Sequence, residues 1–317
     1  MKKSVVLLVV ILALAIATVA GAQDTFKIGY ACNNYNDTFQ TVIQSYAKEF
    51  AEANGAEFVP ADGRDDEMKQ MSDIENFIAD GVDALIVIPV NPQGVDPIID
   101  KAAEAGIPLV FVNRNPFIDS ETAEELPIPD GVYYVGSNEV DAGNFQAEYV
   151  VNKLGEDAQC GYVVLMGQLS NTATPGRTGG NKEIFDKYEG YKFLAEQTGN
   201  WQRDQAVTII ENWITAYGDE LCAVMANNDE MALGAVEALE TAGMKDKVLV
   251  AGVDLIDDAI VAINEGRLDF SAKQDGQGQG EGAVKTAVSV LKGEEVEKWT
   301  VIPFIPVSAE NVADFIK

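Results

Sequence analysis

The fold is decided by the pattern in one stretch, Leu221-Cys-Ala-Val-Met-Ala-Asn-Asn-Asp-Glu-Met-Ala-Leu-Gly-Ala-Val-Glu-Ala-Leu-Glu240. Its first six residues are apolar and are enough for a short buried strand. Apolar residues then recur at helical spacing up to Leu239, and Gly243 stands where a helix usually ends. Asp229 is predicted to be the N-cap of this helix, because its carboxylate can accept from the first free backbone amides. The stretch therefore predicts a strand followed at once by a helix.

Asn228 stands at the carboxyl end of this predicted strand. Open α/β sheets bind their ligands at that edge. An uncharged amide can both donate to and accept from a hydroxyl group, so we interpret Asn228 as a candidate contact to a polyhydroxylated ligand. The alternative, on this stretch alone, is that Asn227 and Asn228 are ordinary turn residues.

The rest of the chain repeats the alternation of strand and helix. One series runs from Phe26 to Asn113, and a loop rich in proline and acidic residues, 115–130, ends it. A second series starts at Val132. Strands that alternate with helices of about ten to fifteen residues are typical of βαβ units and parallel sheets. We therefore expect an α/β protein with two Rossmann-like lobes.

Three segments are expected to cross between the lobes, near Tyr134, Gln274 and Ile302, and to form a three-segment hinge. One last strand is expected near Val301 to Val307. The predicted divisions are residues 1–22 as a signal peptide, 23–134 plus 274–302 as the N-terminal lobe, and 135–273 plus 303–317 as the C-terminal lobe.

The first residues have the order of a secretory signal peptide. Two lysines precede an apolar run from Val5 to Ala20, and small residues suit cleavage between Ala22 and Gln23. The mature chain of about 295 residues is long enough for two domains and is expected in the periplasm. The alternative is an N-terminal membrane anchor that is retained.

Charge and composition exclude several classes of function. The chain has 22 basic and 51 acidic residues, a net charge of −29, which repels nucleic acid and anionic lipid. It has no histidine, which excludes triads, general bases and metal sites built on that residue. Its three cysteines, Cys32, Cys160 and Cys222, allow at most one disulfide, and we expect buried thiols rather than a bridge.

Polar and aromatic side chains gather at the predicted strand ends. Planar carboxylate, amide and guanidinium groups can make paired hydrogen bonds to adjacent hydroxyls. Flat aromatic rings offer an apolar face with little entropy to lose. The set predicts a site for a neutral polyhydroxylated ligand. Its members are Asp37, Phe39, Asn113 and Arg114 from the first half, Arg177, Trp201, Asn228 and Asp254 from the second, and Gln274 near a crossing.

Several candidates have a structural alternative. Asp37 could cap the helix that begins at Thr38, and Asp254 could be the N-cap of the helix that follows it. Arg177 could pair with surface acids, and Trp201 could belong to the core. The ligand site is favoured by the whole set rather than by any single member.

Five segments carry a resemblance to a known family. They are Ala226-Asn-Asn-Asp-Glu-Met-Ala-Leu-Gly-Ala-Val-Glu-Ala-Leu239, Gly252-Val-Asp254, Tyr133-Tyr-Val-Gly136, Val110-Phe-Val-Asn113 and Tyr35-Asn-Asp-Thr-Phe39. Over essentially the whole mature chain, the sequence resembles the periplasmic monosaccharide-binding proteins of ABC importers. These are type I periplasmic binding proteins, and they include the ribose- and galactose/glucose-binding proteins.

The resemblance implies a sugar held between two lobes, whose closure presents a composite surface to the permease of an importer with its ATPase. It implies a binding protein with no catalysis and no cofactor, expected as a monomer. It also implies a role for each candidate: Asp37 and Phe39 as first-lobe contacts, Asn113 and Arg114 at contact positions of the two types, Arg177 as the second-lobe arginine, Trp201 as the stacking ring, Asn228 and Asp254 as the strand-end pair, and Gln274 as the hinge amide.

Departures from the family leave the sugar open. Asn171 and Ala173 stand where galactose/glucose members have His and Asp, and Ile88 stands where ribose members have Asn. The segment 155–160 is too short for the calcium loop of the galactose type, so no metal is expected there. Galactose, glucose, ribose, xylose and an inositol all remain candidates.

Three other classes of function compete with sugar capture. An enzyme is disfavoured, because no nucleophile with a base, metal cluster or Walker sequence is found. The run Gly276-Gln-Gly-Gln-Gly280 lacks the dinucleotide spacing and is interpreted as a flexible approach to a helix over Ala283–Leu291. A sugar-responsive repressor is rejected, because it would need an N-terminal helix-turn-helix and a basic face, whereas this chain has a predicted signal peptide and a net negative charge. A sugar sensor that docks on a membrane receptor or chemoreceptor remains the alternative.

Overall fold

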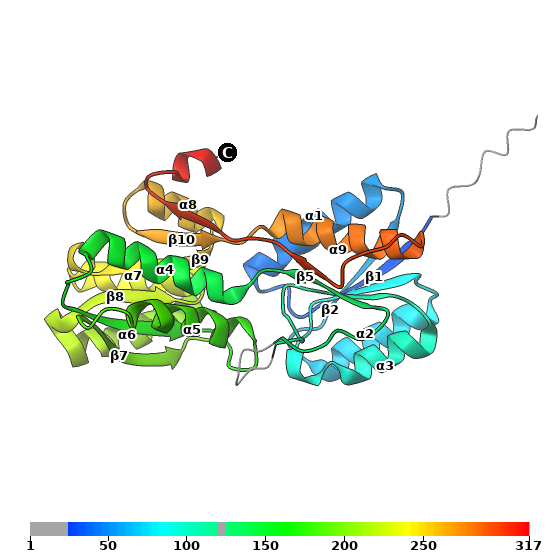
Figure 1. Ribbon diagram of the computed structural model, residues 1–317, viewed down its shortest axis with the longest axis horizontal. Coiled ribbons are helices and arrows are strands. Elements are labelled where there is room, and N and C mark those ends of the chain that lie inside the picture. Colours follow the sequence, from blue (N-terminus) through cyan, green and yellow to red (C-terminus); the bar gives the residue numbers. More distant parts are fainter. Residues whose placement is uncertain (1–24, 119–124, 317) are drawn as a thin grey trace, which may run out of the picture.

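The computed structural model describes residues 25–118 and 125–316, so the predicted signal peptide, 1–22, lies outside the described residues. The chain forms two α/β lobes, each built on one six-stranded sheet with helices on both faces (Figure 1). This confirms the predicted fold class. Among the described helices, none combines the length and the apolar character that a membrane crossing requires.

The first lobe has the strand order β11-β5-β4-β3-β1-β2, and all its neighbouring strands are parallel. Its elements are β1 (Lys27–Cys32), α1 (Thr38–Ala53), β2 (Glu57–Asp62), α2 (Glu67–Ala79), β3 (Ala84–Val87), α3 (Asp96–Ala105), β4 (Leu109–Val112), β5 (Val132–Gly136), α9 (Gly276–Leu291) and β11 (Trp299–Val301).

The second lobe has the order β12-β10-β9-β8-β6-β7, in which only the β10–β12 pair is antiparallel. Its elements are α4 (Glu139–Leu154), β6 (Cys160–Met166), α5 (Ala173–Phe185), β7 (Tyr191–Thr198), α6 (Arg203–Tyr217), β8 (Leu221–Ala226), α7 (Asp229–Thr241), β9 (Leu249–Asp254), α8 (Asp257–Asn264), β10 (Phe270–Lys273), β12 (Ile305–Ser308) and a final 3-10 turn, η4 (Val312–Phe315).

Each sheet is buried on both faces, which explains the continuous apolar runs of its strands. In β3, for example, Ile86 packs in the core that includes α1 and α9, whereas Leu85 and Val87 pack in the core that includes α2 and α3. The side chains alternate because successive residues of a strand point to opposite faces. Because the strand interiors are apolar on both faces, the polar residues of these segments lie at the strand ends.

The chain passes between the two sheets three times: between β5 and α4, between β10 and α9, and between β11 and β12. The prediction of a single last strand over residues 301–307 is wrong, because β11 and β12 are separate strands in different lobes. Pro303 lies between them, and a proline cannot donate to a strand ladder. The last crossing therefore falls at this break.

The glycine-rich segment is not a flexible approach, because α9 already begins at Gly276. Its N-cap is Asp275, whose carboxylate accepts from the Gly278 amide at 3.0 Å. The glycines let α9 lie close against α1 (Figure 1). A Cβ added at Gly280 would stand 2.5 Å from the carbonyl oxygen of Ile43. The glycines therefore serve close helix packing within the first lobe.

The expectation of three buried thiols is also wrong. Cys160 and Cys222 form a disulfide with a Cα–Cα distance of 5.4 Å, and Cys32 is a buried free thiol. The bridge joins β6 and β8, which are neighbours in the second sheet. Strand order and register place the two cysteines together, and neither can be read from spacing alone.

Candidate functional site

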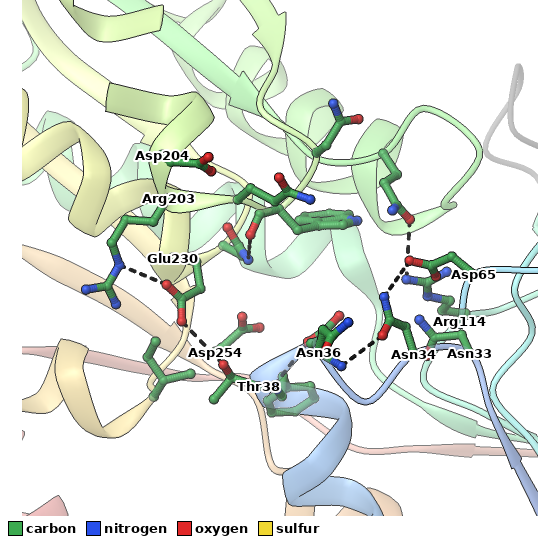
Figure 2. A pocket seen from close by; sticks show the side chains of 18 residues that line it. Asn33, Asn34, Asn36, Thr38, Asp65, Arg114, Arg203, Asp204, Glu230 and Asp254 are labelled. Atoms are coloured by element: carbon green, nitrogen blue, oxygen red, sulfur yellow. Dashed lines mark hydrogen bonds and ion pairs between the residues drawn. The ribbon is translucent and has the colours of Figure 1, made fainter. Parts of the chain in front are cut away.

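A cavity of about 410 Å³ lies between the lobes at the carboxyl ends of the strands (Figure 2). Loops after β1, β2 and β4 reach it from the first lobe, and loops after β6, β7, β8 and β9 reach it from the second. This is the edge at which open α/β sheets bind ligands. The lining residues are Asn33, Asn34, Asn36, Asp37, Thr38, Phe39, Asp65 and Arg114 from the first lobe, and Gln168, Asn200, Trp201, Gln202, Arg203, Asp204, Asn228, Glu230, Asp254 and Ile256 from the second.

Six of the nine predicted site residues line this cavity. They come from both lobes and are Asp37, Phe39, Arg114, Trp201, Asn228 and Asp254. The other three, Asn113, Arg177 and Gln274, are buried and do not line it. The structure brings these three together with Asp254 as a layer behind the cavity wall.

Gln274 links the two lobes within this layer. Its side chain accepts from Asn113 Nδ2 at 2.7 Å and donates to Asp254 Oδ1 at 3.2 Å. Asn113 Oδ1 in turn accepts from Gln40 Nε2 at 2.9 Å. The chain of amides thus connects the floor of the first lobe to a carboxylate of the second, at one of the three crossings.

Arg177 lies between the carboxylates of Glu139, whose side chain is 11% exposed, and the buried Asp254. Its Nε donates to Glu139 Oε2 at 2.7 Å, and its Nη1 donates to the carbonyl oxygen of Asn227 and lies 3.8 Å from Asp254 Oδ1. The proposed alternative, pairing with surface acids, is therefore wrong. Glu139 was missed by the sequence analysis, since nothing marked it among 51 acidic residues.

Burial raises the pKa of Asp254 well above its usual range, while Arg177 opposes this shift. The carboxylates of Asp229, Asp37 and Glu139 raise it further. Burial likewise raises the pKa of Asp37, against the effect of Arg114. The surroundings of Asp37 and Asp254 therefore favour the protonated carboxyl groups more strongly than Arg114 and Arg177 favour the ionised ones.

Asp37 caps α1 and also lines the cavity. Its Oδ1 accepts from the amides of Phe39 at 3.0 Å and Gln40 at 3.4 Å. Arg114 donates from Nη1 to the Val90 carbonyl at 3.1 Å. The capping alternative for Asp37 is thus correct and compatible with a place in the site.

Asn228, not Asp229, is the N-cap of α7, and its Oδ1 accepts from the Met231 amide at 3.1 Å. Asp229 is instead buried, and its carboxylate accepts from the Ser271 hydroxyl at 2.8 Å and the Ile256 amide at 3.0 Å. Ile256 rather than Asp254 is the N-cap of α8. The strand-end carboxylate of Asp254 is thereby left to face the cavity.

Trp201 is held at the edge of the cavity by its neighbours. Its carbonyl accepts from Asn228 Nδ2 at 3.3 Å, and a Cβ at Gly167 would collide with its ring. The Arg177 guanidinium lies 5.7 Å from the ring centroid. Trp201 also packs on the second-lobe core. The alternative that Trp201 belongs to the core is therefore partly correct, since the residue both contacts the core and lines the cavity.

Seven non-glycine residues at these strand ends have positive φ angles, among them Asp65 at 55°, Asn113 at 66°, Trp201 at 67° and Asp254 at 117°. Such conformations are uncommon for residues with a side chain and concentrate at functional sites. Their presence in loops of both lobes supports a site at this edge rather than elsewhere.

The sequence analysis missed further lining residues. Asp65 and Gln168 each follow a strand, as the strand-end rule requires, and could have been found by applying it to β2 and β6. Arg203 and Glu230 form an ion pair at 2.9 Å, marked by a dashed line in Figure 2, and both come from the first turns of helices. Sequence alone gives no sign that these two helices point at the cavity.

The arrangement suits binding rather than reaction. Amides, carboxylates and guanidinium groups surround a space flanked by aromatic side chains, as expected for hydroxyl recognition. Within residues 25–118 and 125–316, no group of three or more Cys, Asp or Glu side chains is placed to hold a metal ion.

Comparisons with known proteins agree with the observed fold. A family model described as a periplasmic binding protein domain matches residues 28–295. The putative rhizopine-binding protein of Rhizobium meliloti is 40% identical over 96% of this chain and 96% of its own length. The ribose import binding protein of Bacillus subtilis is 30% identical over 88% of this chain and 86% of its own. An ABC transporter solute-binding protein from Bacillus halodurans, solved with bound myo-inositol, is 36% identical with a TM-score of 0.83, over 93% of this chain and 98% of that one.

Proposed function

We propose, from the premise that this chain belongs to the periplasmic binding protein family, that it captures a monosaccharide-sized polyol between its lobes for an ABC-type importer. The observation that carries the proposal is the cavity of about 410 Å³, in which strand-end side chains of both lobes meet. Its volume is within the range of small-molecule sites. The protein is a carrier and not an enzyme.

The proposed contacts are those that reach the cavity. Asp37, Arg114, Asn228 and Asp254 would hydrogen-bond hydroxyls of the ligand, and Phe39 and Trp201 would flank its apolar faces. Asn113, Arg177 and Gln274 would act one layer behind, by fixing the carboxylate of Asp254. A hydroxyl missing from a wrong ligand would leave one of these buried groups unpaired, which gives discrimination.

The lobes would rotate about the three crossing segments. Contacts between the lobes already flank the cavity: the Thr38 hydroxyl donates to Glu230 at 3.3 Å, and Arg114 Nη2 donates to Gln168 at 3.4 Å. A ligand that touches both lobes would favour the closed arrangement, which is a familiar mode of switching. The permease would then distinguish closed from open protein.

Among the polyols, we propose the inositols as the first candidates. The Bacillus halodurans structure, 36% identical, holds myo-inositol, and the Bacillus subtilis relative, 30% identical, is named for ribose. We further propose a periplasmic monomer released by cleavage after Ala22, with the permease and ATPase subunits of an importer as partners. Docking on a chemoreceptor stays an alternative prediction.

A thermal-shift screen tests this function. The protein is first freed of bound ligand by unfolding and refolding, and is then heated with pentoses, hexoses and inositols. A ligand that binds only the folded state stabilises it by about 4 kcal/mol at a thousandfold excess over Kd. At least one polyol should raise the melting temperature clearly, and no shift with any member would contradict the proposal.

A further inference from the structure

Gln146 is a fully buried side chain of α4 that does not line the interlobe cavity. Its Nε2 donates to the carbonyl oxygen of Ala226 in β8 at 2.7 Å. The same nitrogen donates to the carbonyl oxygens of Ala251 and Gly252 in β9, at 2.9 and 3.2 Å. Its Oε1 accepts from Asn181 Nδ2 of α5 at 3.2 Å. The amide is therefore satisfied at both ends, and its acceptors belong to two different strands.

The ladder between β8 and β9 ends where Gln146 reaches it. Its last pair is Met225 with Ala251, so Ala226 and Gly252 lie beyond the ladder. Past this point each strand stays with its outer neighbour, because Ala226 still pairs with β6 and Gly252 with β10. The sheet thus parts between β8 and β9, and the Gln146 amide bridges the two edges.

Asp229 contacts β9 from the opposite face. α4 packs in the core that contains Ala251, whereas α7 packs in the core that contains Val250, on the other side of the sheet. Asp229 begins α7, and a Cβ at Gly252 would collide with its carboxylate. The end of β9 is therefore held from one face by Gln146 and contacted from the other by Asp229.

The two bridged strands carry proposed ligand contacts. Asn228 follows Ala226 by two residues, Asp254 follows Gly252 by two, and both contact side chains line the cavity. Asp254 has a φ angle of 117°, a conformation that persists at a non-glycine residue only when its surroundings hold it. The separation of the two strand ends sets the separation of these side chains. It thereby sets which hydroxyls of one ligand the two can bind together.

The first lobe contains the same arrangement. Gln70 of α2 is 2% exposed, and its Nε2 donates to the carbonyl oxygens of Ile88 at 2.8 Å and Ala31 at 3.5 Å. Ala31 belongs to the last pair of the β1–β3 ladder. Gln70 Oε1 accepts from the Val90 amide at 2.9 Å, and the Val90 carbonyl accepts from Arg114 Nη1 at 3.1 Å. Gln70 is therefore one residue away from a side chain that lines the cavity.

We propose that Gln146 and Gln70 are positioning residues of the ligand site. Neither touches the ligand, and each fixes the strand ends of its own lobe so that the contact side chains reach the ligand together. This role rests on the proposed function, because Asn228, Asp254 and Arg114 are contacts only if the cleft binds a polyol. A side-chain amide suits the task, because one NH2 group can donate to carbonyls of two strands at once.

A double-mutant cycle distinguishes positioning from general stabilisation. Ligand-freed proteins are titrated calorimetrically with myo-inositol, ribose, xylose, glucose and galactose, and the cycle uses the tightest binder. Gln146→Met removes the donor and keeps an unbranched side chain, so binding should weaken about tenfold as contacts on both strands lose their geometry. In an Asp254→Ala background the same change should weaken binding about threefold or less, since one of the affected contacts is already absent.

Two comparisons control this cycle. Phe185→Leu removes volume from the core on which α4 packs, at the last residue of α5 and away from the cavity lining. It should lower the melting temperature, as Gln146→Met does, but leave the affinity within about twofold in both backgrounds. Gln70→Met should show the same loss of effect when Arg114→Met is already present.

Equal weakening by Gln146→Met in the two backgrounds, or no weakening in either, would overturn the positioning role while polyol capture stands. If the wild-type protein binds none of the five compounds, the proposed function is overturned and the positioning role with it. Should Gln146→Met fail to fold, Gln146→Asn takes its place in the cycle with the same expected coupling, because its amide is one methylene shorter and should reach one strand at most.

Discussion

Replacing Arg177 by methionine is expected to destabilise the second lobe strongly. The arginine is 4% exposed, binds Glu139 at 2.7 Å, and lies 3.8 Å from Asp254. Its removal leaves the buried Asp254 and the largely buried Glu139 without this cation, and breaking a buried pair from one side costs about 3–5 kcal/mol. Methionine fills much of the same space, so the loss of charge rather than of volume decides the result.

The penalty should depend on pH. Burial already raises the pKa of Glu139 and Asp254 against the effect of Arg177, and removing Arg177 raises both pKa values further. A group whose pKa is higher in the folded than in the unfolded protein binds more protons when folded. Stability is therefore fully present below the unfolded pKa and is lost as pH rises through the folded one. The variant should lose more stability at neutral pH than in mild acid.

Urea unfolding of wild type, Arg177→Met and Arg203→Met measures this effect. Arg203 is a matched control, because it also binds two carboxylates but its side chain is 36% exposed. Exposed ion pairs contribute about 0–1 kcal/mol each. The reasoning is refuted if the two variants lose equal stability with the same dependence on pH.

Three further predictions concern packing, protonation and the stacking ring. Gly280→Ala should lower the melting temperature, because its Cβ meets Ile43 and overpacking costs about 1–3 kcal/mol; the open Gly179→Ala should not. Burial raises the pKa of Asp229 to about 7, so the free energy of unfolding of the protein should fall as pH rises from about 4 to 7. Asp229→Asn should reduce this dependence on pH by up to ~1.4 kcal/mol per pH unit, measured by urea unfolding. If Asp229→Asn leaves the pH dependence of stability unchanged, Asp229 is not the group that causes it. Trp201→Leu should weaken binding by about 1 kcal/mol or more and remove the ligand-induced change in tryptophan fluorescence, and a preserved signal would move Trp201 out of the contact.

The sequence predicted the fold class because its information is local. Apolar runs and helical spacing identify strands and helices without knowledge of their neighbours. The strand-end rule then located six lining residues, including Asn228 and Asp254. It succeeded because the carboxyl ends of parallel strands meet at one edge of a sheet.

The predictions that were wrong concern how deeply side chains are buried and which groups they contact. Spacing places Arg177 and Gln274 near the strand ends, but only the folded backbone decides that they lie behind Asp254. The disulfide depends on the order and register of β6 and β8. The helical glycines of α9 are needed because α1 lies against them, and no local propensity records that neighbour. Asn228 caps α7 instead of the predicted Asp229, because the Asp229 carboxylate accepts hydrogen bonds from the Ser271 hydroxyl and the Ile256 amide.

The central claim is that the interlobe cavity is the ligand site, with Asp254 among its contacts. Calorimetric titration of ligand-freed wild type and Asp254→Ala with the best polyol of the thermal-shift screen tests it most directly. We predict one site per chain in the wild type and a loss of about 2 kcal/mol, roughly thirtyfold in Kd, in the variant, because a buried partner is removed. Binding of equal affinity in both proteins would place the ligand outside this cavity and contradict the account.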